Sequence, residues 1–190
     1  MGFKAQLVAS FIGLATIAHV SPVFAQSTFV APKKAAAQED ELRLASLDPS
    51  DLKAAVARSS AVNQRSGRIW CVPFAREVSG INLSGNAKTW WDKADGVYAK
   101  GKRPVVGSVL NFRGTRKMPM GHVAVVSRVV SPRKILIDHA NWHRNKVSQN
   151  MAVVDVSAKN DWSAVRVETL PNTLGDVYPT YGFIYRTASN

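Results

Sequence analysis

The chain has 190 residues, enough for one hydrophobic core and too few for several domains of ordinary size. It is basic, with 25 Lys and Arg against 13 Asp and Glu and a formal net charge of +12. The single cysteine excludes an intramolecular disulfide, and no zinc-finger spacing or aromatic-basic RNA motif supports nucleic-acid binding.

The N-terminal segment has the composition of an export signal. Lys4 precedes an apolar run over Ala5–Ala18, and Val23–Ala25 ends in small residues. This pattern predicts a secretory signal peptide over residues 1–25. A retained membrane anchor is the alternative, although the run is shorter than the roughly 20 residues that a span needs. We therefore expect a periplasmic or secreted protein.

Residues 26–59 form a predicted flexible lead-in, because they are rich in Ala, Lys and Gln and show no sustained period. Within it, Asp48–Asp51 supply helix-capping residues and Leu52 and Val56 follow at helical spacing, which predicts a short helix. Whether this helix packs on the domain stays open. The compact domain is predicted over residues 60–190.

The first helix of that domain is predicted over residues 70–78, with Cys71 and Pro73 in its first turn, where proline is tolerated. Gly80 is placed to end the helix in the left-handed conformation. A second helix is predicted over residues 87–99.

From residue 108 onward the pattern becomes that of short strands bounded by Gly, Pro, Asn or Ser. The predicted strands cover residues 108–112, 122–130, 135–141, 152–156, 164–169 and 182–186. Residues 160–162 and 177–181 are predicted to form turns and corner packing. Helices followed by consecutive strands predict an α+β domain with an antiparallel β-sheet of about five to six strands.

Polar residues gather at the ends of two of these strands. His122 begins one strand, while His139 and Asn141 end the apolar face of the next and Asp138 points to its opposite face. We therefore expect His139 or Asn141, rather than Asp138, to lie beside the His122 ring.

Cys71 and His122 together have the residue types that thiol catalysis needs. The positive end of a helix dipole and a neighbouring imidazolium both favour a thiolate, so we expect a lowered pKa for Cys71. A histidine can then move the proton while a third group orients its ring. A buried, inert cysteine is the alternative.

The motifs, in their order along the chain, resemble the CHAP domain, the family of cysteine, histidine-dependent amidohydrolases and peptidases. The matching segments are Cys71–Arg76 with Gly80, Trp90, Pro104–Val109, Gly121–Val126 and Ile137–Trp142. The resemblance implies a papain-like fold and hydrolysis of amide bonds in peptidoglycan. It also implies that Cys71 is the nucleophile and His122 the general base and acid.

The third catalytic position departs from the family pattern, which commonly has Glu where this chain has His139, while Asn141 is kept. His139 or Asn141 is therefore expected to orient His122. For the oxyanion, the Cys71 N–H and the Gln64 side chain are candidate donors. Trp90 and Trp91 are candidates for substrate binding, with core packing as the alternative.

Basic residues are concentrated over residues 100–150, which hold eleven Lys or Arg and one acid, Asp138. This charge predicts attraction to anionic cell-envelope polymers, or a solvated face. A second hypothesis is accordingly a catalytically weak or inactive envelope-binding module. We expect a monomer without a cofactor; a zinc site built from Cys71, His122 and His139 is the chemical alternative.

Overall fold

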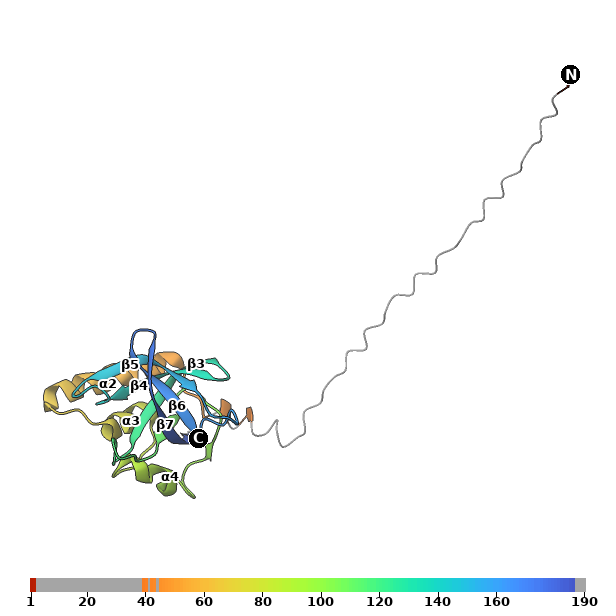
Figure 1. Cartoon of the computed structure of the whole chain (residues 1–190). Coiled ribbons are helices and arrows are strands. Elements are labelled where there is room, and N and C mark those ends of the chain that lie inside the picture. The colour runs from red at the N-terminus through yellow and green to blue at the C-terminus, as the bar shows by residue number, and fades with distance from the viewer. Residues whose placement is uncertain (3–38, 41, 44, 187–190) are drawn as a thin grey trace. The chain divides into compact units, whose positions relative to one another are not determined.

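The structure is a computed structural model that describes residues 1–2, 39–40, 42–43 and 45–186 (Figure 1). The predicted signal peptide, apart from Met1 and Gly2, lies outside the described residues, as does the lead-in up to residue 38. No helix in the described part of the chain combines the length and apolar character that crossing a bilayer requires.

The described chain is α+β, as predicted, with its helices ahead of its strands. The helical elements are α2 (Pro49–Ser66), α3 (Cys71–Ser79), the 3-10 helix η1 (Ala87–Thr89) and α4 (Trp90–Lys93). The strands are β1 (Lys100–Gly101), β2 (Val109–Phe112), β3 (His122–Ser131), β4 (Lys134–Ala140), β5 (Val147–Asp155), β6 (Ala164–Leu170) and β7 (Thr173–Ile184).

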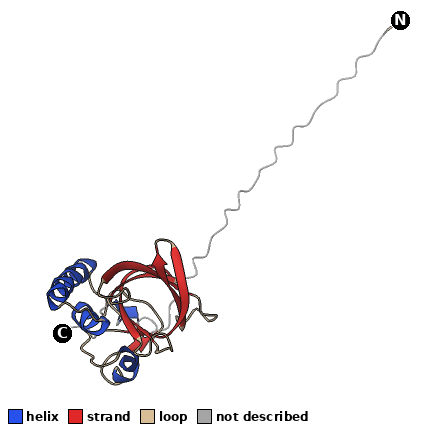
Figure 2. Cartoon of the chain, turned by 60° about the vertical axis from the view of Figure 1, so that its left-hand side comes forward, coloured by secondary structure: helices blue, strands red, loops and turns tan. Residues whose placement is uncertain are grey.

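The antiparallel sheet closes into a six-stranded barrel, a closure that the sequence did not predict. The strand order is β7-β2-β3-β4-β5-β6, and β6 pairs again with β7, while β1 pairs with β7 outside the ring. Figure 2 shows the strands curving into this closed sheet. The long strand β7 makes the closure possible: Val177 pairs with Arg166 of β6, and Phe183 pairs with Leu110 of β2.

The prediction of turns at residues 177–181 is therefore wrong, because these residues belong to β7. Pro179 is compatible with the strand since its carbonyl still accepts a hydrogen bond, from the N–H of Arg113 at 3.0 Å. Residues 160–162 form a bend outside the strands, and Trp162 is buried there, in agreement with the predicted corner packing.

Alternate side chains of β3 point into two different hydrophobic cores. Val123 and Val125 belong to the core beneath the helices, whereas Ala124 and Val126 belong to the core inside the barrel. Figure 2 shows the helices gathered beside the strands rather than around them.

The helix predicted after Asp48 is α2, with the Asp48 carboxylate accepting from the Ser50 N–H at 2.8 Å. Leu52 and Val56 are buried in the core beneath the helices, which answers the question left open by the sequence. The domain boundary predicted at residue 60 falls inside this helix.

Helix α3 begins at Cys71 and ends before Gly80, whose φ of 73° is left-handed, as predicted. The helix predicted over residues 87–99 is shorter than expected. It comprises only η1 and α4, and the chain leaves the helix through a turn at Gly96, which has a φ of 72°.

Gly121 brings η1 against the start of β3. Its φ is 69°, and a Cβ at this position would lie 2.8 Å from both the Lys88 nitrogen and the Phe112 carbonyl oxygen. The Lys88 N–H donates to the Met120 carbonyl at 2.9 Å across the same contact. Only glycine allows this approach without strain, and it fixes the chain directly before His122.

Candidate active site

Cys71 is the first residue of α3 and is half-buried. Its sulfur interacts with the backbone N–H groups of Cys71, Val72 and Val123. Because Val123 follows His122 in β3, the thiol contacts the strand backbone one residue after His122. The described contacts include no hydrogen bond between the thiol and the His122 ring.

Burial raises the pKa of the Cys71 thiol, and this effect outweighs the N–H groups of Val123, Cys71 and Val72, which lower it. The expectation of a lowered pKa is therefore wrong for the free protein. That expectation assumed a charged imidazolium near the thiol, whereas the imidazoles of His122 and His139 are both neutral. The resting site holds a protonated thiol at neutral pH.

His122 and His139 form a buried pair at one end of the barrel interior. His122 Nε2 lies 3.1 Å from His139 Nδ1, and the two residues are 5% and 0% exposed. Phe112 and Trp142 enclose the His122 ring, with centroid distances of 5.7 Å and 5.1 Å.

Burial lowers the pKa of His122 to about 3. The pKa of His139 is also far below its ordinary value, first through burial and then through the charges of His122 and His143. Both rings are consequently neutral at physiological pH, so each carries one N–H and one bare nitrogen.

Met151 determines which nitrogens carry the protons. His139 Nε2 lies 2.9 Å from Met151 Sδ, and a thioether sulfur can only accept a hydrogen bond. His139 must therefore donate from Nε2, which leaves its Nδ1 to accept from His122 Nε2–H. His122 then has a bare Nδ1, the form that can take a proton from a thiol.

Asn141 and Asp138 do not take the position beside His122. The Asn141 side-chain oxygen accepts from the Asn145 N–H at 2.9 Å, and the residue has a left-handed φ of 61°. Asp138 Oδ1 accepts from the Asn150 N–H at 2.7 Å. Among the alternatives, His139 is the group that contacts the His122 ring.

Trp90 is fully buried in the core, so its predicted role in substrate binding is wrong: its ring has no surface to offer a ligand. Trp91 is half-buried, and its ring stacks on Tyr181 at 5.7 Å beneath Lys100. Gln64 lies in the last turn of α2, and its side chain is outside the described residues.

A hollow of about 250 Å³ opens over Cys71, with Trp70 and Met120 among its lining residues. Trp70 is 47% exposed, and its position directly before the cysteine was a signal that sequence reasoning could have used. Met151 had no such local signal. Its place depends on the pairing of β4 with β5, whose register shifts between Ile137 and His139.

No group of three or more His, Cys, Asp and Glu side chains in the described part of the chain is arranged to hold a metal ion. Cys71, His122 and His139 thus do not form the zinc cluster considered from the sequence.

The fold and site define a class of protein in which a helix carrying a cysteine packs against an antiparallel sheet that carries histidines. The family model described as CHAP domain matches residues 63–141, a stretch that includes Cys71, His122, His139 and Asn141. Over this stretch the chain is similar to the CHAP domain, in agreement with the resemblance that the motifs indicated. The family is peptidoglycan-related and its members are generally amidases or peptidases. Searches of curated proteins and of solved structures gave no match.

The raised pKa of Cys71 predicts the pH dependence of its alkylation. Since only the thiolate reacts, the rate with iodoacetamide should be low at pH 7 and still rising above pH 9. The same chain unfolded in urea is the control, because its thiol titrates at the ordinary value. A rate that reaches a plateau below pH 7 in the folded protein contradicts the neutral resting site.

The lowered pKa values of the two histidines predict loss of stability in acid. Below about pH 6.5 the two imidazoles are protonated in the unfolded chain but stay neutral in the folded protein. The free energy of unfolding should therefore fall as the pH decreases toward 3. Each ring contributes a slope of about 1.4 kcal/mol per pH unit. Urea unfolding between pH 4 and 7 measures this slope, and His139→Gln should flatten it; an unchanged slope would argue against buried neutral rings.

The hydrogen bond to Met151 predicts a coupling energy. Met151→Leu keeps the volume but removes the acceptor, leaving a buried N–H unpaired at a cost of about 1–3 kcal/mol. In a His139→Phe background the same substitution should cost much less. A double-mutant cycle from denaturant unfolding measures the difference, and equal costs in both backgrounds would show that Met151 acts by packing alone.

Proposed function

We propose that the protein is an exported cysteine amidase or endopeptidase that hydrolyses amide bonds of peptidoglycan. The observation that carries this proposal is the hydrogen-bonded series Met151–His139–His122, which leaves His122 Nδ1 unprotonated. His122 directly precedes Val123, whose backbone N–H contacts the Cys71 thiol. The papain-like architecture implied by the motifs belongs to the same proposal. Its support is α3, which carries Cys71 and packs against β3, which carries His122.

In the proposed acylation, His122 Nδ1 takes the proton of the Cys71 thiol as the sulfur attacks the scissile carbonyl carbon. The tetrahedral intermediate collapses when Nδ1–H returns this proton to the leaving amine nitrogen and the C–N bond breaks. A thioester remains on Cys71. Water then attacks the thioester, with His122 accepting its proton, and the sulfur leaves and is reprotonated as the carboxylic acid is released.

The first turn of α3 can stabilise the oxyanion. The N–H groups of Cys71 and Val72 have no intrahelical acceptor, as expected at a helix N-terminus, and both point toward the sulfur. The Cys71 N–H is therefore the proposed donor. His139 acts as a positioning residue, since its Nδ1 accepts the hydrogen bond from His122 Nε2–H and so orients the His122 ring.

Export to the periplasm or medium is part of the proposal and rests on the composition of residues 1–25. In that compartment the substrate is accessible to a basic protein without a further translocation step.

The same site supports a second candidate, a weakly active or inactive envelope-binding module. Among the described residues no carboxylate contacts the imidazole pair, and burial both raises the pKa of Cys71 and lowers that of His122. These shifts oppose formation of a thiolate–imidazolium pair, so we expect slow turnover. His139→Glu should increase it by supplying the missing charge.

Digestion of purified peptidoglycan tests the proposal. The unmodified chain should release soluble fragments whose masses identify the cut amide bond, and Cys71→Ser should reduce this release by at least about 10³-fold. Equal release of soluble fragments by the unmodified chain and by Cys71→Ser would contradict the proposed hydrolase activity. Sedimentation of Cys71→Ala with cell walls, together with an absence of turnover by the unmodified chain, assigns the binding module instead.

A further inference from the structure

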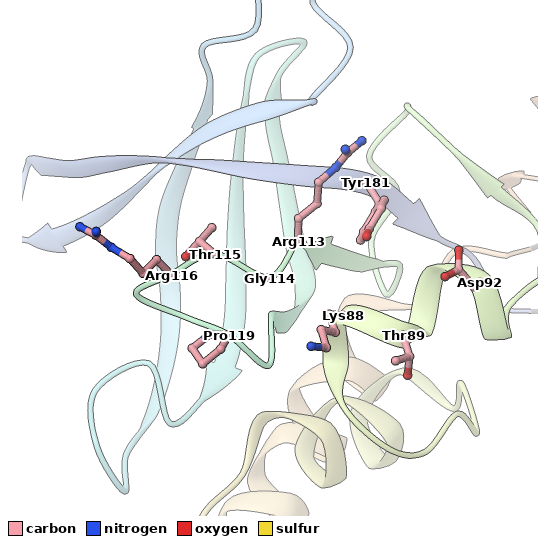
Figure 3. A pocket seen from close by; sticks show the side chains of 9 residues that line it. All are labelled: Lys88, Thr89, Asp92, Arg113, Gly114, Thr115, Arg116, Pro119 and Tyr181. Atoms are coloured by element: carbon pink, nitrogen blue, oxygen red, sulfur yellow. The ribbon is translucent and has the colours of Figure 1, made fainter.

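A larger pocket lies next to the hollow over Cys71 and has no role in the chemistry above. Its volume is about 630 Å³, and its charged lining residues are Lys88, Arg113, Arg116 and Asp92 (Figure 3). Three cations thus face one carboxylate. In the described part of the chain, none of these three cations forms an ion pair.

The pocket and the Cys71 hollow adjoin each other where η1 contacts the residues directly before β3. Ala87 and Met120 line the hollow, whereas their chain neighbours Lys88 and Pro119 line the pocket. Lys88 N–H donates to the Met120 carbonyl at 2.9 Å between them. Because an extended chain advances about 3.3–3.6 Å per residue, a peptide bound over Cys71 reaches the pocket within a few residues.

Arg113 is held in place before any ligand binds. Its Nε donates to the Thr180 carbonyl at 3.1 Å, and its guanidinium lies 4.5 Å over the Tyr181 ring. Tyr181 in turn stacks on Trp91 at 5.7 Å. The two terminal guanidinium nitrogens have no hydrogen-bond partner among the described residues. A fixed guanidinium with both terminal nitrogens free matches the two oxygens of a carboxylate.

Lys88 is positioned by the loop that carries Arg116. A Cβ at Gly114 would lie 3.4 Å from Lys88 Cδ and 3.0 Å from the Pro119 carbonyl oxygen, so the lysine stem packs against this glycine. Figure 3 shows Lys88 directed toward Gly114 and Pro119, on the opposite side of the pocket from Asp92. Lys88 is therefore the pocket cation that directly follows a lining residue of the hollow, Ala87, in the chain.

We propose that this pocket is a subsite for a carboxylate of the substrate peptide, with Arg113 as its main ligand and Lys88 as a second cation. The inference rests on the proposed function, because it places the carboxylate within a few residues of the amide bond at Cys71. It assigns to the enzyme a preference for stem peptides with free carboxylates over the amidated forms.

The test measures binding rather than turnover. Full-length Cys71→Ala is titrated calorimetrically with a synthetic peptidoglycan stem peptide and with the same peptide whose carboxylates are amidated. We expect the free peptide to bind about tenfold more tightly. Arg113→Gln should abolish this preference, and Lys88→Gln, which leaves the Arg113 stack intact, should reduce it. Arg128→Gln is the matched control, because Arg128 is an exposed residue of β3 outside the pocket.

Three results overturn the proposal: equal affinities for the two peptides, equal losses from Arg113→Gln and Arg128→Gln, or tighter binding of a glycerol phosphate oligomer through Arg113. The last result assigns the pocket to phosphodiester polymers of the envelope. Failure of the unmodified chain to digest peptidoglycan would defeat the hydrolase but leave the carboxylate preference of the Cys71→Ala protein standing, so the two failures are distinguishable.

Discussion

The arrangement of the site depends on the thioether of Met151, whose sulfur can accept a hydrogen bond but cannot donate one. Met151 fixes the proton of His139 on Nε2, His139 fixes that of His122 on its own Nε2, and the remaining nitrogen of His122 is left bare. In a buried aromatic enclosure an unpaired N–H is costly, so this order of donors is strongly favoured. The His122 ring is thus oriented by neutral hydrogen bonds rather than by a buried negative charge.

The fold brings the remaining parts to this series. The close approach at Gly121 sets η1 against the first residue of β3, and α3 presents its first turn to the next residue, Val123. One contact therefore places the apolar hollow over Cys71 on one side and the cationic pocket of Arg113 on the other. The strand ends supply the two histidines, whereas the helical segments supply Cys71 and part of the lining of both the hollow and the pocket.

Much of this arrangement was predictable from local sequence. The start of α3 at Cys71, its end at Gly80 and the shared face of Ile137 and His139 all follow from turn chemistry and strand alternation. Barrel closure and the contact with Met151 were not predictable, because they depend on the register of β5 and β7 across distant segments. The sequence left the burial of Trp90 open as an alternative and predicted the wrong direction for the pKa of Cys71, because both properties are set by the surrounding core.

The proton positions in the imidazole pair test the central claim most directly. Long-range ¹H–¹⁵N correlation spectra of the uniformly labelled protein near pH 7 distinguish protonated from bare ring nitrogens. We predict that His122 and His139 are both neutral with the proton on Nε2, and that they stay so as the pH falls below the ordinary pKa of histidine. A doubly protonated His122 ring, or a proton on its Nδ1 instead of Nε2, would contradict the account.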